Sequence, residues 1–109
     1  MPYTKTLHLQ ECDYDPMHCV RGGVLSTLLD SVMTQSVHTS LPPGKSYIAH
    51  EMKVQFLKPV GENTEEIVAE GHVVSCSPRL ATAEGKITDG KGYVYATASA
   101  TCLVVDSAS

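Results

Sequence analysis

The segment Arg21–Asp30 reads RGGVLSTLLD, two glycines that lead into a helical pattern. Small and apolar residues recur at spacings of three and four, which predicts one broad stripe on a helix: Val24, Leu25, Leu28, Leu29, Val32 and Ser36. The glycines indicate the start of this helix. The sequence LPPG at Leu41–Gly44 indicates its end, because proline cannot continue the hydrogen-bond ladder.

The opposite side of this helix is unusual for a surface. Its residues are small and almost uncharged: Ser26, Thr27, Asp30, Thr34 and His38. A solvent-facing side would carry Lys and Glu, so we expect this side to be covered by another subunit. A single carboxylate in such a place, Asp30, is costly unless it has a partner or a chemical role.

The remainder of the chain predicts strands. Tyr3–Gln10 alternates apolar and polar residues, the period of a half-buried strand. Four more strands are expected at Ser46–Leu57, Glu65–Cys76, Leu80–Thr88 and Tyr93–Val105. The short connections VGENT, SPR and DGKG favour antiparallel pairing. One helix is too little to cover a flat sheet of this length on both faces, so an α+β fold with a curled sheet wrapped around one helix is expected.

Composition narrows the class of protein. The 109 residues suit a single domain, 1–109, and 42% hydrophobic residues are enough for a core. The net charge of −4, without a Lys or Arg stripe, argues against a nucleic-acid partner. No apolar run is long enough to span a bilayer, and the N-terminal segment lacks the apolar region of a signal peptide. We therefore expect a cytoplasmic protein with no membrane partner.

The cysteines give no metal or redox motif. Cys12, Cys19, Cys76 and Cys102 lie in separate segments without CxxC spacing, so reduced thiols are expected. A metal site from Cys12, His18 and Cys19 lacks a fourth ligand. A Cys19 nucleophile supported by His18 is also possible, but adjacent side chains seldom point at one another in the required geometry.

Two stretches carry a resemblance to a known family. They are DPMHCVRGGVLSTLLDSVMTQSVHTSLPPGKSYIAHEMKVQFLKPV and SPRLATAEGKITDGKGYVYATASATCLVV. Both resemble the hotdog-fold acyl-CoA thioesterases of the phenylacetate-pathway type. The resemblance implies a sheet wrapped around a long central helix, with two protomers joined into one continuous sheet and tetramers common. It also implies an enzyme that hydrolyses acyl-CoA or similar thioesters, with no cofactor beyond the coenzyme A of the substrate.

The family's catalytic pair matches two positions of this chain. Gly22 matches the glycine whose backbone N–H polarises the thioester carbonyl, a role that suits the free donors of a helix N-terminus. Asp30 matches the carboxylate that acts as nucleophile or as general base on water. Eight residues of helix separate them by about 12 Å along the axis. One chain therefore cannot aim both groups at one carbonyl, and the site needs Gly22 from one protomer and Asp30 from its neighbour.

The chain departs from the family pattern beside this pair. Asp15-Pro16 stands where the family usually has Asn-Pro, and Arg21-Gly22-Gly23 stands where it has His-Gly-Gly. We expect Asp15 and Arg21 to pair with each other or to bind substrate together. Gly23 belongs to the same substrate-binding helix entry.

Four further positions are candidate substrate contacts. Ala49 occupies the position of a family Ser or Thr, and the adjacent His50 could supply the missing polar contact. Lys58 and Arg79, at strand ends, are candidates for the phosphates of coenzyme A, although solvated surface charge is an equally good explanation.

Structural explanations stand beside these functional ones. Gly22 and Gly23 could serve only to allow close packing at the start of the helix. Asp30 could be a paired or solvated helix residue, and Asp15 could be a turn carboxylate. The departures also leave open a hotdog-fold protein that binds an acyl-CoA or small ligand without turnover. A hotdog dehydratase fits less well, because its His and acid pair is not recognisable.

Overall fold

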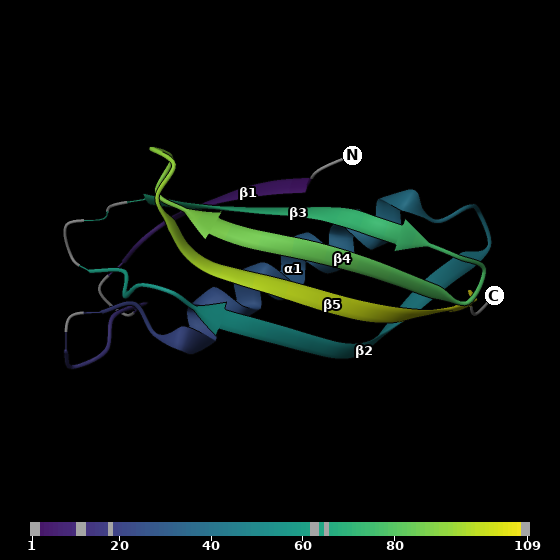
Figure 1. Ribbon diagram of the computed structural model, residues 1–109, viewed down its shortest axis with the longest axis horizontal. Coiled ribbons are helices and arrows are strands. Elements are labelled where there is room, and N and C mark those ends of the chain that lie inside the picture. The colour runs from purple at the N-terminus through teal and green to yellow at the C-terminus, as the bar shows by residue number, and fades with distance from the viewer. Residues whose placement is uncertain (1–2, 11–12, 18, 62–63, 65, 108–109) are drawn as a thin grey trace.

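The computed structural model of the chain describes residues 3–10, 13–17, 19–61, 64 and 66–107. It contains one helix, α1 (Gly22–Ser40), and an antiparallel sheet with the strand order β1-β3-β4-β5-β2. The strands are β1 (Tyr3–His8), β2 (Lys45–Phe56), β3 (Glu66–Cys76), β4 (Leu80–Thr88) and β5 (Val94–Asp106). The sheet curls over one face of α1, with β1 and β2 at its edges (Figure 1). The expected α+β architecture is confirmed.

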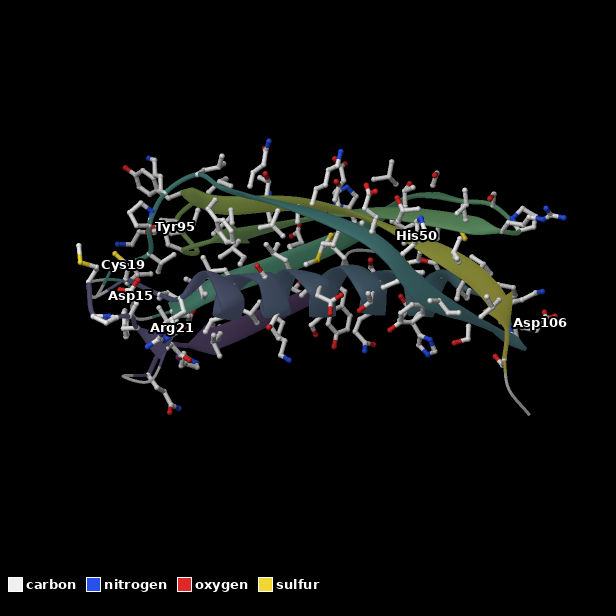
Figure 2. All side chains as sticks on the ribbon, turned by 90° about the horizontal axis from the view of Figure 1, so that it is seen from below. Asp15, Cys19, Arg21, His50, Tyr95 and Asp106 are labelled. Carbon is white, nitrogen blue, oxygen red and sulfur yellow. The ribbon has the colours of Figure 1, made fainter. Side chains whose placement is uncertain are left out.

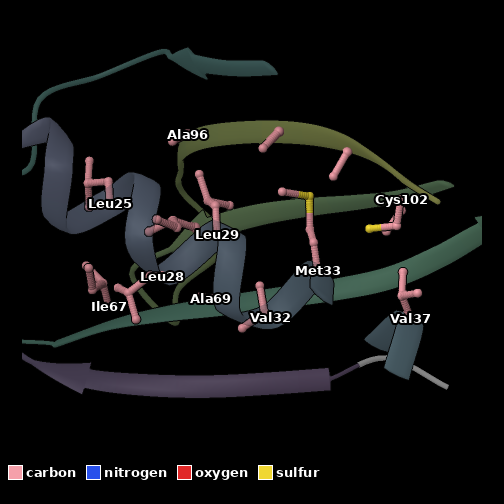
Figure 3. Packing of buried hydrophobic residues seen from close by; sticks show 14 of the residues in the cluster. Leu25, Leu28, Leu29, Val32, Met33, Val37, Ile67, Ala69, Ala96 and Cys102 are labelled. Atoms are coloured by element: carbon pink, nitrogen blue, oxygen red, sulfur yellow. The ribbon is translucent and has the colours of Figure 1, made fainter. Parts of the chain in front are cut away.

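The core lies between α1 and the inner face of the sheet (Figure 3). Leu29, Val32, Met33 and Val37 are fully buried, each worth about 1.5–3 kcal/mol relative to an exposed position. They meet small residues on the strands, among them the buried alanines Ala69, Ala81, Ala83, Ala96, Ala98 and Ala100. Small strand residues let the sheet approach the helix closely.

Two strand glycines set that approach. A Cβ added at Gly71 on β3 would lie 2.5 Å from the carbonyl oxygen of Val32, and one at Gly85 on β4 would lie 3.0 Å from Cγ of Met33. The helix backbone therefore rests on β3 at a distance that only glycine permits. The sequence pattern did not single out either residue.

One helix position differs from expectation. Thr34 was expected on the side of α1 that another subunit covers, but it is 8% exposed within the single chain. Its hydroxyl donates to the backbone carbonyl of Asp30 at 2.8 Å, which satisfies the buried oxygen. The sheet thus reaches farther around the helix than the apolar stripe predicted. Thr27, Asp30 and His38 of the same side are exposed in the single chain.

Strand boundaries agree with the expected ones to within two residues, and the expected start of β3 at Glu65 lies outside the described residues. The DGKG turn forms a hairpin between β4 and β5, with φ of +83° at Gly90 and +99° at Gly92. Edge strand β2 carries a bulge: Ala49 pairs with Cys102 and Glu51 with Thr101, which leaves His50 as the extra residue.

Candidate active site

The N-terminus of α1 presents free backbone donors. Arg21 is the N-cap residue, with φ −62° and ψ 137°, and its side chain makes no capping hydrogen bond. Its carbonyl accepts from the N–H groups of Val24 and Leu25, and no acidic residue lies in the first turn. Within the described part of the chain, the N–H groups of Gly22 and Gly23 have no protein acceptor. These donors, at the positive end of the helix dipole, suit an oxygen that gains negative charge.

Gly22 opens into a small cavity at one end of the molecule. The cavity has a volume of about 250 Å³ and is lined by Gly22 and Leu25 of α1, by Cys19 and Val20, and by residues 56–60 at the end of β2. The ring of Phe56 forms a wall against Gly22, because a Cβ at Gly22 would lie 3.4 Å from it. The lining is mainly apolar, and Gly22 itself is exposed in the single chain.

Asp30 is exposed in the single chain. Burial, and then the nearby Asp30 carboxylate, raise the pKa of the Cys102 thiol on β5. This carboxylate is two turns of helix from Gly22, about 12 Å along the axis.

The expected pairing of Asp15 with Arg21 does not form. Asp15 Oδ1 instead accepts from the backbone N–H groups of Met17, at 2.8 Å, and Cys19, at 3.1 Å. The carboxylate therefore closes a turn in the loop before α1, the structural explanation that the sequence left open. Both residues do lie at the Gly22 end of the molecule (Figure 2). Arg21 is exposed, and with Gly23 it lines a separate open pocket beside β1.

Ala49 and His50 lie in the middle of β2, and Figure 2 shows His50 well separated from Arg21, the residue before Gly22. Both are exposed, and β2 is an edge strand of the sheet. His50 is the bulge residue and has no Cα partner on β5. The structure therefore does not bring these two residues to Gly22 within one chain, and their role as substrate contacts stays a prediction.

Lys58 and Arg79 are at opposite ends of the molecule. Lys58 lines the Gly22 cavity, whereas the carbonyl of Arg79 accepts from Val104 near the far end of β5. They do not form one phosphate site within a single chain. Sequence reasoning missed Phe56, although alternation along β2 could have placed it on the inner face. It also missed Tyr93, whose ring lies under Lys58, and no sequence signal linked these two.

Neither a metal centre nor a membrane helix is found in the described part of the chain. No group of three or more His, Cys, Asp or Glu side chains there could hold a metal ion. Cys12 and His18, needed for the metal and thiol alternatives, lie outside the described residues. No described helix is long and apolar enough to cross a bilayer.

Comparison with known proteins places this geometry in a family. The family model described as Thioesterase superfamily matches residues 18–96, which include the double glycine and Asp30. The chain belongs to the thioesterase superfamily. None of the curated proteins matches the sequence.

Solved structures share the fold of this thioesterase-superfamily chain. The BH2602 protein from Bacillus halodurans, solved with CoA, is 26% identical with a TM-score of 0.87, over 94% of this chain and 67% of its own. The thioesterase HI1161 from Haemophilus influenzae is 15% identical with a TM-score of 0.88, over 96% and 72%. A mutant form of the phenylacetic acid degradation protein PaaI from Thermus thermophilus is 20% identical with a TM-score of 0.81, over 94% and 84%. The curled sheet around one helix is thus the hotdog fold, which the chain shares with these proteins.

Proposed function

We propose that this protein hydrolyses acyl-CoA or a related carrier thioester. The observation that carries the proposal is the pair of N–H donors at Gly22 and Gly23, which have no acceptor within residues 3–10, 13–17, 19–61, 64 and 66–107, with Gly22 lining a mainly apolar cavity. In hydrolysis, the carbonyl oxygen gains negative charge as water or a carboxylate attacks the carbonyl carbon. The C–S bond then breaks, the thiolate takes up a proton, and a carboxylic acid is released. Membership of the thioesterase superfamily and the CoA-bound structure of the Bacillus protein support this choice.

Asp30 is the proposed attacking or activating group, supplied by the partner subunit. As a general base, its carboxylate takes a proton from the water that attacks the carbonyl. As a nucleophile, it forms a mixed anhydride with the acyl group and releases the thiol, and water then cleaves the anhydride. A single turnover in heavy-oxygen water separates the routes, because only an anhydride intermediate can leave the label in Asp30.

The proposed assembly is a homodimer formed through the edges of β2. Exposed apolar side chains on this strand support it: Ile48 is 54%, Met52 39% and Phe56 54% exposed. An unpaired strand edge with such side chains is a template for pairing with another chain. The dimer covers these side chains and carries Asp30 of the partner subunit toward Gly22. A dimer of dimers stays a prediction.

The test is steady-state hydrolysis of a panel of acyl-CoAs, together with sedimentation at micromolar concentration. Turnover of at least one acyl-CoA by a dimeric or larger species is expected. Binding of CoA thioesters without turnover would replace this proposal with the non-catalytic binding protein. A stable, folded monomer with full activity would exclude the shared site.

A further inference from the structure

Lys58 is a cation that lines the edge of the Gly22 cavity. It is exposed, and among the described residues it forms no ion pair. Its backbone is fixed, because the N–H groups of Leu57 and Lys58 both donate to the carbonyl of Tyr95, at 2.8 and 3.1 Å. The base of this lysine therefore stays beside the cavity.

The ammonium group has a defined place. Nζ of Lys58 lies 5.2 Å from the centroid of the Tyr93 ring, within the range of cation–π attraction. Tyr93 is 59% exposed, so its ring is not part of the core. The ring contacts the ammonium group of Lys58. The ring favours this position among those that a long, flexible side chain can adopt.

Tyr93 is itself anchored by the hairpin between β4 and β5. Its N–H donates to Oδ1 of Asp89 at 3.3 Å, and its carbonyl accepts from the N–H of Asp89 at 3.3 Å. The same Asp89 oxygen accepts from the N–H of Lys91 at 2.8 Å. The ring is therefore carried by a closed turn and not by a free loop.

A CoA thioester has two parts that need different surroundings. Its carbonyl requires donors in an apolar pocket, and its phosphates require a cation in contact with water. Gly22 and Lys58 line the same cavity, and the ammonium of Lys58 extends from it to the exposed hairpin. We propose that Tyr93 is a positioning residue that holds the Lys58 ammonium at this cavity mouth for the phosphates of coenzyme A. This inference rests on the proposed function for its substrate.

Direct binding of coenzyme A and of pantetheine, which lacks the nucleotide and its phosphates, tests the proposal without requiring turnover. Lys58→Met should weaken coenzyme A binding by about fivefold, the upper range for an exposed charge pair, and leave pantetheine binding unchanged. Tyr93→Leu should weaken coenzyme A binding by about two- to fivefold, and Tyr93→Phe, which keeps the ring face, should restore it. Lys86→Met, an equal charge change on the exposed face of β4, is the matched control and should have no effect.

Two further readouts separate positioning from a general structural effect. In the Lys58→Met background, Tyr93→Leu should have no additional effect, because the ring acts only through the ammonium. With turnover, these variants should raise KM for an acyl-CoA with kcat unchanged, and should leave hydrolysis of the matching acyl-pantetheine unaltered. The wild type could fail to hydrolyse any acyl-CoA while the substitutions still weaken coenzyme A binding and not pantetheine binding. That result would reject the proposed hydrolysis but not this inference. Equal effects on coenzyme A and pantetheine, additive effects of the two substitutions, or no coenzyme A binding by the wild type would overturn the inference.

Discussion

The backbone N–H of Gly22 can be removed with little expected change to the fold. Gly22 is the first residue of α1, where proline is favoured because its fixed φ suits the helix and no intrahelical bond is lost. The preceding residue must be extended, and Arg21 has φ −62° and ψ 137°. The N–H of Gly22 has no acceptor in the described part of the chain. Gly22→Pro therefore deletes one donor at a position that tolerates proline.

The expected loss is that of one oxyanion donor. Removing such a donor lowers kcat by about 100- to 1,000-fold, or about 2.7–4 kcal/mol of transition-state stabilisation. KM should change little, because the donor acts mainly on charge that develops during the reaction. Gly22→Ala is the matched control, since it keeps the N–H and its Cβ would lie 3.4 Å from the Phe56 ring, an ordinary contact. Its rate should stay within about fivefold of the wild type, about 1 kcal/mol.

The assay follows thiol release from the best acyl-CoA, with thermal unfolding and sedimentation measured for both variants. The reasoning requires a folded Gly22→Pro protein that is far slower than Gly22→Ala. Equal losses in the two variants would mean that Gly22 matters for its packing against Phe56. A proline variant as fast as the alanine variant would show that the N–H does not polarise the carbonyl.

Asp30→Asn should keep the fold and the assembly, seen by circular dichroism and sedimentation, but lower hydrolysis by at least about 100-fold; an unchanged rate would make Asp30 structural. Met52→Asp places a charge on the open edge of β2 and should shift sedimentation toward the monomer, whereas an unaltered dimer would place the interface elsewhere. Gly71→Ala should lower the free energy of unfolding in urea by about 1–3 kcal/mol, because its Cβ would lie 2.5 Å from a helix carbonyl oxygen. Gly23→Ala is the control and should leave this free energy unchanged, because nothing lies within 4 Å of its Cβ. Equal unfolding midpoints for the two variants would refute this explanation. Because the folded chain raises the pKa of the Cys102 thiol above its ordinary 9.0, the native state binds more protons there, so stability should fall as the pH rises above about 9. Cys102→Ala should flatten that fall, and an identical pH profile would contradict the assignment.

The elements were predictable because each depends on local pattern. The helix stripe and the strand alternation give the correct periods, and the DGKG turn needs the positive φ that Gly90 and Gly92 adopt. Burial of Thr34 was not predictable, because it depends on how far the curled sheet extends around the helix. The close approach at Gly71 likewise depends on a distance between elements that no local pattern contains.

The site was predictable only in part, for a related reason. The roles of Gly22 and Asp30 come from the family resemblance and stay predictions. The Asp15 carboxylate instead accepts from backbone N–H groups of its own loop, which compete with its expected partner. Tyr93 and Lys58 meet because the end of β2 lies beside the start of β5, where Leu57 and Lys58 bond the carbonyl of Tyr95. Lys58 and Tyr93 are so far apart in the sequence that no periodic pattern of residues could link them. Residues that act through tertiary contacts therefore need the fold before they can be assigned.

The separation of Gly22 from Asp30 within one chain has a chemical reason. A carboxylate in the first turn of α1 would be favoured by the helix dipole and would occupy the same N–H donors that the thioester oxygen requires. The first turn has no acidic residue, and those donors have no acceptor among the described residues. Placing the carboxylate two turns along the helix prevents it from capping its own N-terminus. In the proposed dimer, the partner subunit would bring its Asp30 to the carbonyl that the Gly22 donor polarises, so association would complete a site that neither chain holds alone.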